Sequence, residues 1–250
     1  MDQTDFLLII PRELLSIVFS LANLSSIFCL SRASKKYASD RIIRTVLCGQ
    51  TMCTIHFSAI ENNHYDLFKW LMWGNQIKSP IDRQNYMKYA IQCGRLEILK
   101  YLRTQDRYDN SNLTNCAAEY GKLEILQYLH ENGCSLGYAI STYACSGEND
   151  TASLEILRYL EEKGWSIIFD HECYRAAVFR GHLDVIKYLH KKGCQWDEHM
   201  CAIAVEYGHL DVLKYLRDNG CQWDRSSYMY AVISGRSDIL EYLQDNGCPM

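Results

Sequence analysis

Long apolar runs are missing from this sequence. The longest wholly apolar run near the N-terminus, Phe6 to Ile10, is far too short to cross a bilayer, and no cleavable signal pattern follows it. Basic residues are not in excess either, since the first fifty residues carry a net charge of +2 and the remainder a net charge of −6. An acidic array argues against binding a nucleic-acid backbone as the main task. We therefore expect an intracellular protein, in the cytoplasm or alternatively the nucleus, that binds neither a membrane nor a nucleic acid.

The motifs of common catalytic sites are also missing. The sequence has no Gly-rich phosphate loop and no Gly-x-Ser-x-Gly elbow. His171 and Glu172 begin like the zinc motif of metalloproteases, but Arg175 stands where the second histidine is required. We expect no enzymatic activity, no cofactor and no bound metal.

What the sequence does contain is internal repetition. The stretch GHLDVIKYL at 181–189 returns as GHLDVLKYL at 208–216, and weaker copies occupy most of the chain. Equivalent leucines stand 27 residues apart in the regular copies and 29 or 31 apart where loop residues are inserted, as at Glu148 to Thr151. This period gives seven copies and predicts a solenoid. Each copy contains an alanine at one position: Ala59, Ala90, Ala117, Ala144, Ala177, Ala204 and Ala231.

Each copy predicts two short helices. In the sixth copy, Asp197 suits the N-cap of a first helix that ends at Gly208. A second helix with an apolar stripe follows at once, and Gly220 suits its left-handed C-cap. The small Ala204 is expected to let the two helices touch closely. One such hairpin cannot bury both of its faces, so stability has to come from stacking on neighbouring copies.

The stretch AAVFRGHLDVIKYLHKKGC from Ala176 resembles the ankyrin repeat, with its Ala-Ala, two free positions, Gly-His, apolar helix and closing Gly. The usual Thr-Pro-Leu-His opening is absent, and only seven residues separate Asp197 from Ala204, fewer than a β-hairpin requires. These features resemble the shortened ankyrin-like repeat that is abundant in giant DNA viruses. The expected fold is all-α, an ankyrin-like helical-hairpin solenoid of about seven short repeats over residues 52–250. Another helical-hairpin solenoid is the alternative.

The cysteines fit the repeat better than a metal site. Four of the twelve follow the glycine that ends a copy and are expected to be small buried thiols: Cys134, Cys194, Cys221 and Cys248. One cluster, Cys48, Cys53 and His56, has metal-like spacing. Structural zinc takes four ligands in two paired halves, and no second half is visible nearby.

The first fifty residues do not follow the period. The segment IIPRELLSIVFSLANLSSIFCLSRASKKYA at 9–38 predicts two apolar helices and resembles an F-box, with Tyr37 in the place of the usual tryptophan. This resemblance implies a small helical F-box-like domain over residues 4–48 that docks on the adaptor subunit of a cullin-RING ubiquitin ligase. The expected docking residues are Pro11, Leu14, Leu15, Ile17, Val18, Leu24 and Leu30. A helical N-terminal cap of the array is the alternative.

Positions that do not repeat are free to carry function, because stacking fixes the others. In the ankyrin family the two positions before Gly-His and the start of the first helix face the concave groove, whereas the histidines of that motif, here His182 and His209, are structural. The candidates that this implies for binding a target are Gln92, Glu119, Tyr120, Phe179, Arg180, Glu206, Tyr207 and Ile233, with Cys93 and Ser234 beside them. Their mixture of aromatic, charged and aliphatic side chains suits a protein-binding surface, and an ordinary solvated face is the alternative.

These interpretations together indicate a non-catalytic adaptor with two parts. The F-box would dock on a cullin-RING ligase adaptor subunit, and the repeats of a monomeric chain would capture an unidentified target protein for ubiquitylation. The alternative is a plain ankyrin-repeat scaffold or decoy that binds and masks a host protein without recruiting a ligase. A viral origin would place either one in the host cytoplasm.

We expect the purified protein to contain no stoichiometric zinc, because the Cys48, Cys53 and His56 cluster lacks a second pair of ligands. Elemental analysis measures the metal content, and a chelator should leave the melting temperature unchanged. One zinc ion per chain would contradict this expectation.

Overall fold

The structure is a computed structural model that describes residues 50–74, 80–104, 111–165, 171–197 and 199–250. The F-box-like segment at 4–48 and its seven docking candidates lie outside these residues. The chain divides into two compact units, residues 1–107 and residues 108–250.

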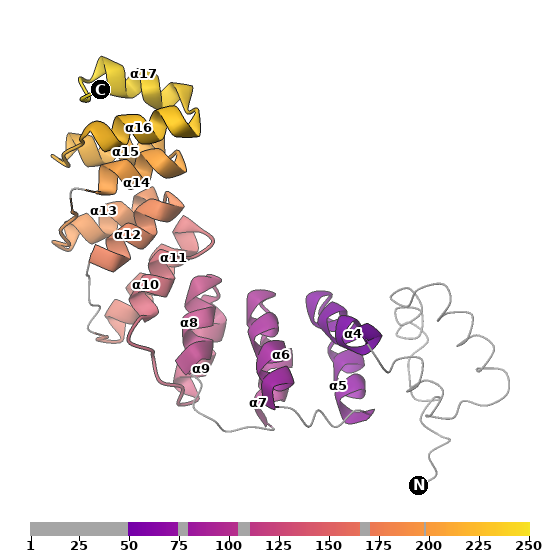
Figure 1. Ribbon diagram of the computed structural model, residues 1–250. Helices are drawn as coiled ribbons and strands as arrows, with labels where there is room; N and C mark the ends of the chain where they lie inside the picture. The colour runs from indigo at the N-terminus through magenta and orange to yellow at the C-terminus, as the bar shows by residue number, and fades with distance from the viewer. Residues whose placement is uncertain (1–49, 75–79, 105–110, 166–170, 198) are drawn as a thin grey trace, which may run out of the picture. The chain divides into compact units, whose positions relative to one another are not determined.

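The described residues form helical hairpins throughout (Figure 1). The first unit contains α4 (Gln50–Glu61), α5 (Tyr65–Gly74), α6 (Pro80–Gln92) and α7 (Leu96–Thr104). The second unit contains α8 (Ser111–Glu119), α9 (Leu123–Glu131), α10 (Ile140–Cys145), α11 (Asp150–Glu162), α12 (His171–Arg180), α13 (Leu183–Lys191), α14 (Met200–Tyr207), α15 (Leu210–Asp218), α16 (Arg225–Ser234) and α17 (Ser237–Asp245). Seven hairpins and no strand occur among the described residues, which confirms the expected all-helical hairpin architecture. None of the described helices is long and apolar enough to span a membrane.

A completely buried alanine lies within every hairpin. All seven alanines that define the period have 0% exposed surface. A methyl side chain lets neighbouring helix backbones approach closely, and any larger group at these positions would have to be accommodated by moving a helix. The alanine period therefore reports the packing of the array, as the sequence predicted.

Left-handed glycines end the helices. Gly208 closes α14 with φ 81°, and Gly220 follows α15 with φ 90°. Beyond Gly220, the Cys221 N–H donates to the Leu216 carbonyl at 2.9 Å, which is the long hydrogen bond of a Schellman motif. The residue that makes this bond usually packs back on the helix as an apolar contact. This geometry explains the repeated Gly-Cys pair, and all four of its cysteines are buried as predicted.

The start of a first helix follows the prediction with a small shift. The Asp197 carboxylate accepts a hydrogen bond from the His199 N–H at 2.8 Å, and α14 begins at Met200 rather than directly after Asp197. In the next hairpin, Asp224 is the N-cap of α16. The Ser226 hydroxyl and nearby backbone N–H groups donate to the Asp224 carboxylate and hold its pKa below the usual value.

In the second unit the first helices of the hairpins pack in one row, α8, α10, α12, α14 and α16, which we call the first row. The second row consists of α9, α11, α13, α15 and α17. Two histidines at the N-termini of second-row helices donate hydrogen bonds to backbone carbonyls of the preceding hairpin. His182 Nε2 donates to the Gly147 carbonyl at 2.8 Å, and His209 Nε2 donates to the Phe179 carbonyl at 3.0 Å. Both histidines therefore act structurally, as expected.

Recurring tyrosines bridge neighbours in the second row. The Tyr159 hydroxyl lies 2.9 Å from His130 Nδ1, and the Tyr215 hydroxyl lies 2.8 Å from His190 Nδ1. The Tyr188 hydroxyl donates to Glu161 at 2.7 Å, and hydrogen bonds from Lys192 and Tyr188 lower the pKa of Glu161. Tyr159 is buried, whereas Tyr188 and Tyr215 are half-buried, and each of the three hydroxyls reaches a polar partner on the preceding helix of the second row.

The insert at Glu148 to Thr151 is a loop in its first half and helical in its second, since Asp150 and Thr151 belong to the first turn of α11. The Asn149 side chain accepts from the Ala152 N–H at 3.1 Å and so begins α11 one turn early, at Asp150. The Asp150 carboxylate then accepts from the N–H groups of Asp184 and Val185, at 2.9 and 3.1 Å, in the first turn of α13. Those N–H groups have no side-chain cap from His182 at the N-cap position. The insert therefore caps a helix of the following hairpin.

The last hairpin is only partly a polar cap. In α17, Ser237, Glu241 and Gln244 are exposed. In α16, however, Val232 is 48% exposed, whereas Val178 and Val205 at the same position of earlier hairpins are completely buried. The reason is geometric, since within the described residues no further hairpin covers this side of α16.

We expect Asp150→Ala to lower the free energy of unfolding by about 1 kcal/mol, because the first turn of α13 loses its capping carboxylate. Denaturant titration followed by circular dichroism measures the change. Glu155→Ala is the matched control, since Glu155 is exposed on the same helix and should change stability by less than about 0.5 kcal/mol. Equal effects of the two substitutions would show that the cap is unimportant.

Candidate functional site

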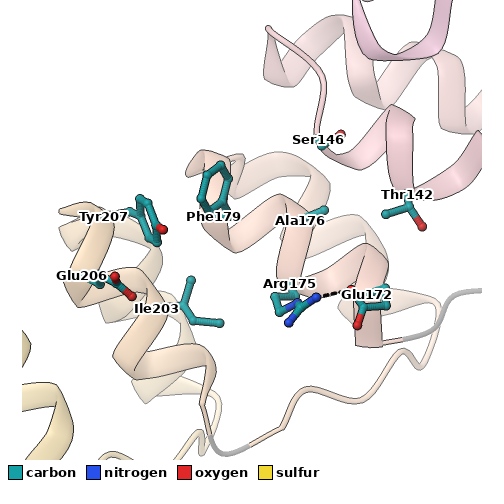
Figure 2. A pocket seen from close by; sticks show the side chains of 9 residues that line it. All are labelled: Thr142, Ser146, Glu172, Arg175, Ala176, Phe179, Ile203, Glu206 and Tyr207. Atoms are coloured by element: carbon teal, nitrogen blue, oxygen red, sulfur yellow. Dashed lines mark hydrogen bonds and ion pairs between the residues drawn. The ribbon is translucent and has the colours of Figure 1, made fainter. Parts of the chain in front are cut away.

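A groove crosses the first row of the second unit, over α10, α12 and α14 (Figure 2). Its volume is about 370 Å³, and a second hollow of about 450 Å³ adjoins it along α10. The side chains that line the groove are Thr142, Ser146, Glu172, Arg175, Ala176, Phe179, Ile203, Glu206 and Tyr207. The second hollow adds Tyr138 and Tyr143 at its edge, both of which are exposed.

Two aromatic rings form one side of the groove. The ring centroids of Phe179 on α12 and Tyr207 on α14 are 4.3 Å apart, with the ring planes tilted by 56°. Their side chains remain 43% and 40% exposed although they contact each other. Ile203, one turn before Tyr207, extends this apolar surface. Adjacent aromatic rings with exposed area are typical of the anchoring part of a protein interface.

The charges in the groove are unevenly balanced. Arg175 lies 2.5 Å from one carboxylate oxygen of Glu172, and His171 lies 3.3 Å from the other. Within the described part of the chain, the carboxylate of Glu206 makes no comparable hydrogen bond or ion pair, and the side chain is exposed. The groove therefore combines an apolar surface with one uncompensated negative charge.

The structure brings together three of the eight predicted target-binding residues, namely Phe179, Glu206 and Tyr207. Arg180 does not line the groove but connects two hairpins, since its Nε donates to the Ser146 carbonyl of the preceding hairpin at 2.9 Å. Its guanidinium lies 5.9 Å from the Phe179 ring centroid.

The other four predicted residues do not line the groove. Ile233 is 75% exposed on α16, the next helix of the first row. Glu119 and Tyr120 are half-buried at the end of α8, where the Glu119 carbonyl accepts from the Glu148 N–H at 3.2 Å. Gln92 is exposed and belongs to the first compact unit.

Sequence reasoning missed most of the groove lining. It named the start of the first helix as facing the groove, but its candidate residues came only from the two positions before each Gly-His. Residues four positions earlier share a helical face, and this rule gives Arg175 from Phe179 and Ile203 from Tyr207. Thr142 and Ser146 had no such signal, because the insert shifts the fourth copy out of register.

The arrangement is suited to binding rather than to metal chemistry. Among the residues that the structure describes, no three His, Cys, Asp or Glu side chains are grouped to hold a metal ion. Of the cluster with metal-like spacing, Cys48 lies outside the described residues. His56 is buried, and its ring stacks on Tyr86 with centroids 5.2 Å apart.

A helical-hairpin solenoid with an open aromatic groove defines a protein-binding repeat scaffold. Comparison with protein families agrees: the family model described as Ankyrin repeats (3 copies) matches residues 55–140 and 173–250. These residues make up more than half of the chain, so the chain belongs to the ankyrin-repeat family. A search among curated proteins finds no match. Ankyrin repeats are typically non-catalytic interaction domains, and the chain is accordingly a protein-interaction scaffold.

The family match is interrupted at residues 141–172, which include most of α10 and the whole of α11. This is the hairpin whose insert lengthens α11 and places Asp150 against α13. The interruption therefore has a structural cause, and the hairpin remains part of the stack.

We expect Phe179→Ala and Tyr207→Ala each to change the free energy of unfolding by less than about 1 kcal/mol, because both rings are already partly exposed. Tyr174→Ala, which removes a completely buried ring from α12, should cost about 3 kcal/mol or more. Denaturant titration of the three variants tests the difference. Losses of similar size would mean that the groove aromatics hold the stack together.

Proposed function

We propose that the chain is a non-catalytic adaptor that brings a target protein to a cullin-RING ubiquitin ligase. In this proposal the F-box-like segment at 4–48 docks on the ligase adaptor subunit, and the array at 52–250 captures the target. The observation that carries target capture is the exposed pair Phe179 and Tyr207 in the groove.

These two rings are not required by stacking. The position of Phe179 is occupied by Glu206 and Ile233 in the next two hairpins, and the position of Tyr207 by Arg180 and Ser234 in its neighbours. The array therefore tolerates polar and charged side chains at both positions. Large aromatic side chains left half-exposed at such freely variable positions suit a surface that another protein covers.

Docking on the ligase is supported by residues of the F-box pattern. Ile10, Pro11, Glu13, Leu14 and Leu15 fill its first helix, and Phe19, Ser20 and Leu21 fill its turn. A simple helical cap would require amphipathic helices but not Pro, Glu and Ser at these places. The proposed setting is the cytoplasm, that of a host cell if the chain is viral, with a monomeric chain between ligase and target.

A plain scaffold or decoy is the second candidate, and a specific observation favours it. The aromatic groove lies wholly within residues 111–250, so it could bind and mask a protein without any contribution from the N-terminal segment. The two candidates differ only in whether a ligase adaptor subunit is recruited.

The experiment that separates them is co-purification of the full chain with the ligase adaptor subunit. We expect the wild-type chain to bind it and Leu14→Asp with Ile17→Asp to abolish binding, because unpaired charges in an apolar contact are costly. Phe179→Ala with Tyr207→Ala is the matched control, since it should retain adaptor binding. A folded wild-type chain that does not bind the adaptor subunit would establish the decoy function instead.

A further inference from the structure

The groove places a negative charge beside an apolar surface. Of its two carboxylates, Glu172 is neutralised by Arg175 at 2.5 Å. Glu206 remains without a cationic partner among the described residues and stands next to Tyr207 on α14 (Figure 2). Among the side chains that line the groove, two carboxylates thus stand against one guanidinium, and the array is itself acidic, with 20 Lys and Arg against 26 Asp and Glu after residue 50.

The exposed ring faces add to the attraction for a cation. The face of an aromatic ring is electronegative, and a cation within about 6 Å of its centroid is stabilised. The Arg180 guanidinium already occupies such a position 5.9 Å from Phe179. The Tyr207 ring has no cation of this kind among the described residues, which leaves its exposed face beside Glu206 open to one from outside.

Lysine and arginine have the shape that this surface needs. Each has a long apolar stem that packs on hydrophobic surface and a charged end that remains hydrated or meets a carboxylate. On this groove, the stem would cover Ile203 and the aromatic pair while the charged end reaches Glu206. An acidic side chain would meet repulsion at the same place.

We infer that the groove recognises a short segment of a protein partner through a basic side chain that lies between the Phe179–Tyr207 pair and Glu206. An apolar residue next to that side chain fills the remaining surface at Ile203 and Ala176. This inference rests on target capture by the array and specifies its chemistry. It does not depend on recruitment of a ligase.

The test begins with selection from a random linear peptide library displayed on phage, using the immobilised full chain. Clones that also bind Phe179→Ala with Tyr207→Ala are discarded. We expect the remaining peptides to share a Lys or Arg beside an aromatic or aliphatic residue. Recovery of no peptide that requires the aromatic pair would overturn both target capture at this groove and the inference.

A charge exchange then tests Glu206 directly, with the Kd of the enriched peptide measured by calorimetry. Glu206→Lys should weaken the basic peptide by about tenfold or more, and replacing the basic residue of the peptide by Glu should restore a large part of the affinity for this variant. Glu241→Lys, the same change at an exposed position on α17, is the matched control and should alter the Kd by less than about twofold.

Two results would overturn the inference while leaving target capture intact. One is a set of enriched peptides that need Phe179 and Tyr207 but share no basic residue. The other is an equal loss of affinity for Glu206→Lys and Glu241→Lys, which would assign the charge effect to the array as a whole. Binding of the ligase adaptor subunit is measured separately, so its failure would not affect either result.

Discussion

A close contact between a glycine and the next hairpin, made at Gly121, Gly181 and Gly208, is the constraint on which the stacking of the second unit depends. A Cβ atom at Gly181 would lie 2.4 Å from Nδ1 of His209, and one at Gly208 would lie 2.3 Å from Cζ of Arg236. At the first of these joints, His209 also donates to the Phe179 carbonyl. Gly181 is therefore needed twice, once for its left-handed backbone and once for its missing side chain, whereas the Arg236 guanidinium beside Gly208 is the end of a flexible side chain that can move. The joint that fixes the stacking also fixes the backbone of Phe179, so the same contact positions a groove residue against Tyr207.

The regular part of this arrangement could be predicted from the sequence because it repeats. Alanine and glycine at fixed spacing gave the hairpins, and Gly-Cys pairs gave the buried thiols, since close packing and left-handed caps accept few residue types. The smaller part of the groove lining was predictable. Phe179, Glu206 and Tyr207 were found from their places before Gly-His, whereas Glu172 and Arg175 reach the groove through the helical period alone. The bond from Arg180 to the Ser146 carbonyl depends on how two hairpins dock, and no local pattern encodes that.

The fourth copy shows why irregular positions resist prediction. Its extra residues looked like a loop inserted in a repeat. In the structure Asn149 begins a longer helix, and Asp150 supplies the cap that His182 does not provide for α13. An insertion thereby becomes a contact between hairpins, and the repeat period survives because the added turn lies along α11. The same hairpin contributes Thr142 and Ser146 to the groove, so its departure from the family pattern coincides with the end of the binding surface.

In the first-row helices, some positions are occupied by residues that stabilise the stack, and other positions are free to vary and carry recognition. Along α12, α14 and α16 the completely buried alanine recurs, and the residue two places later changes from Phe179 to Glu206 to Ile233. Because the joints hold these helices in register, each substitution alters the chemistry of the surface without altering the stack. An aromatic ring, a carboxylate and an aliphatic side chain thus follow one another in a fixed order. In the proposed complex, affinity would come from the aromatic area that the partner buries, and the Glu206 carboxylate would select against acidic side chains, because like charges placed side by side repel.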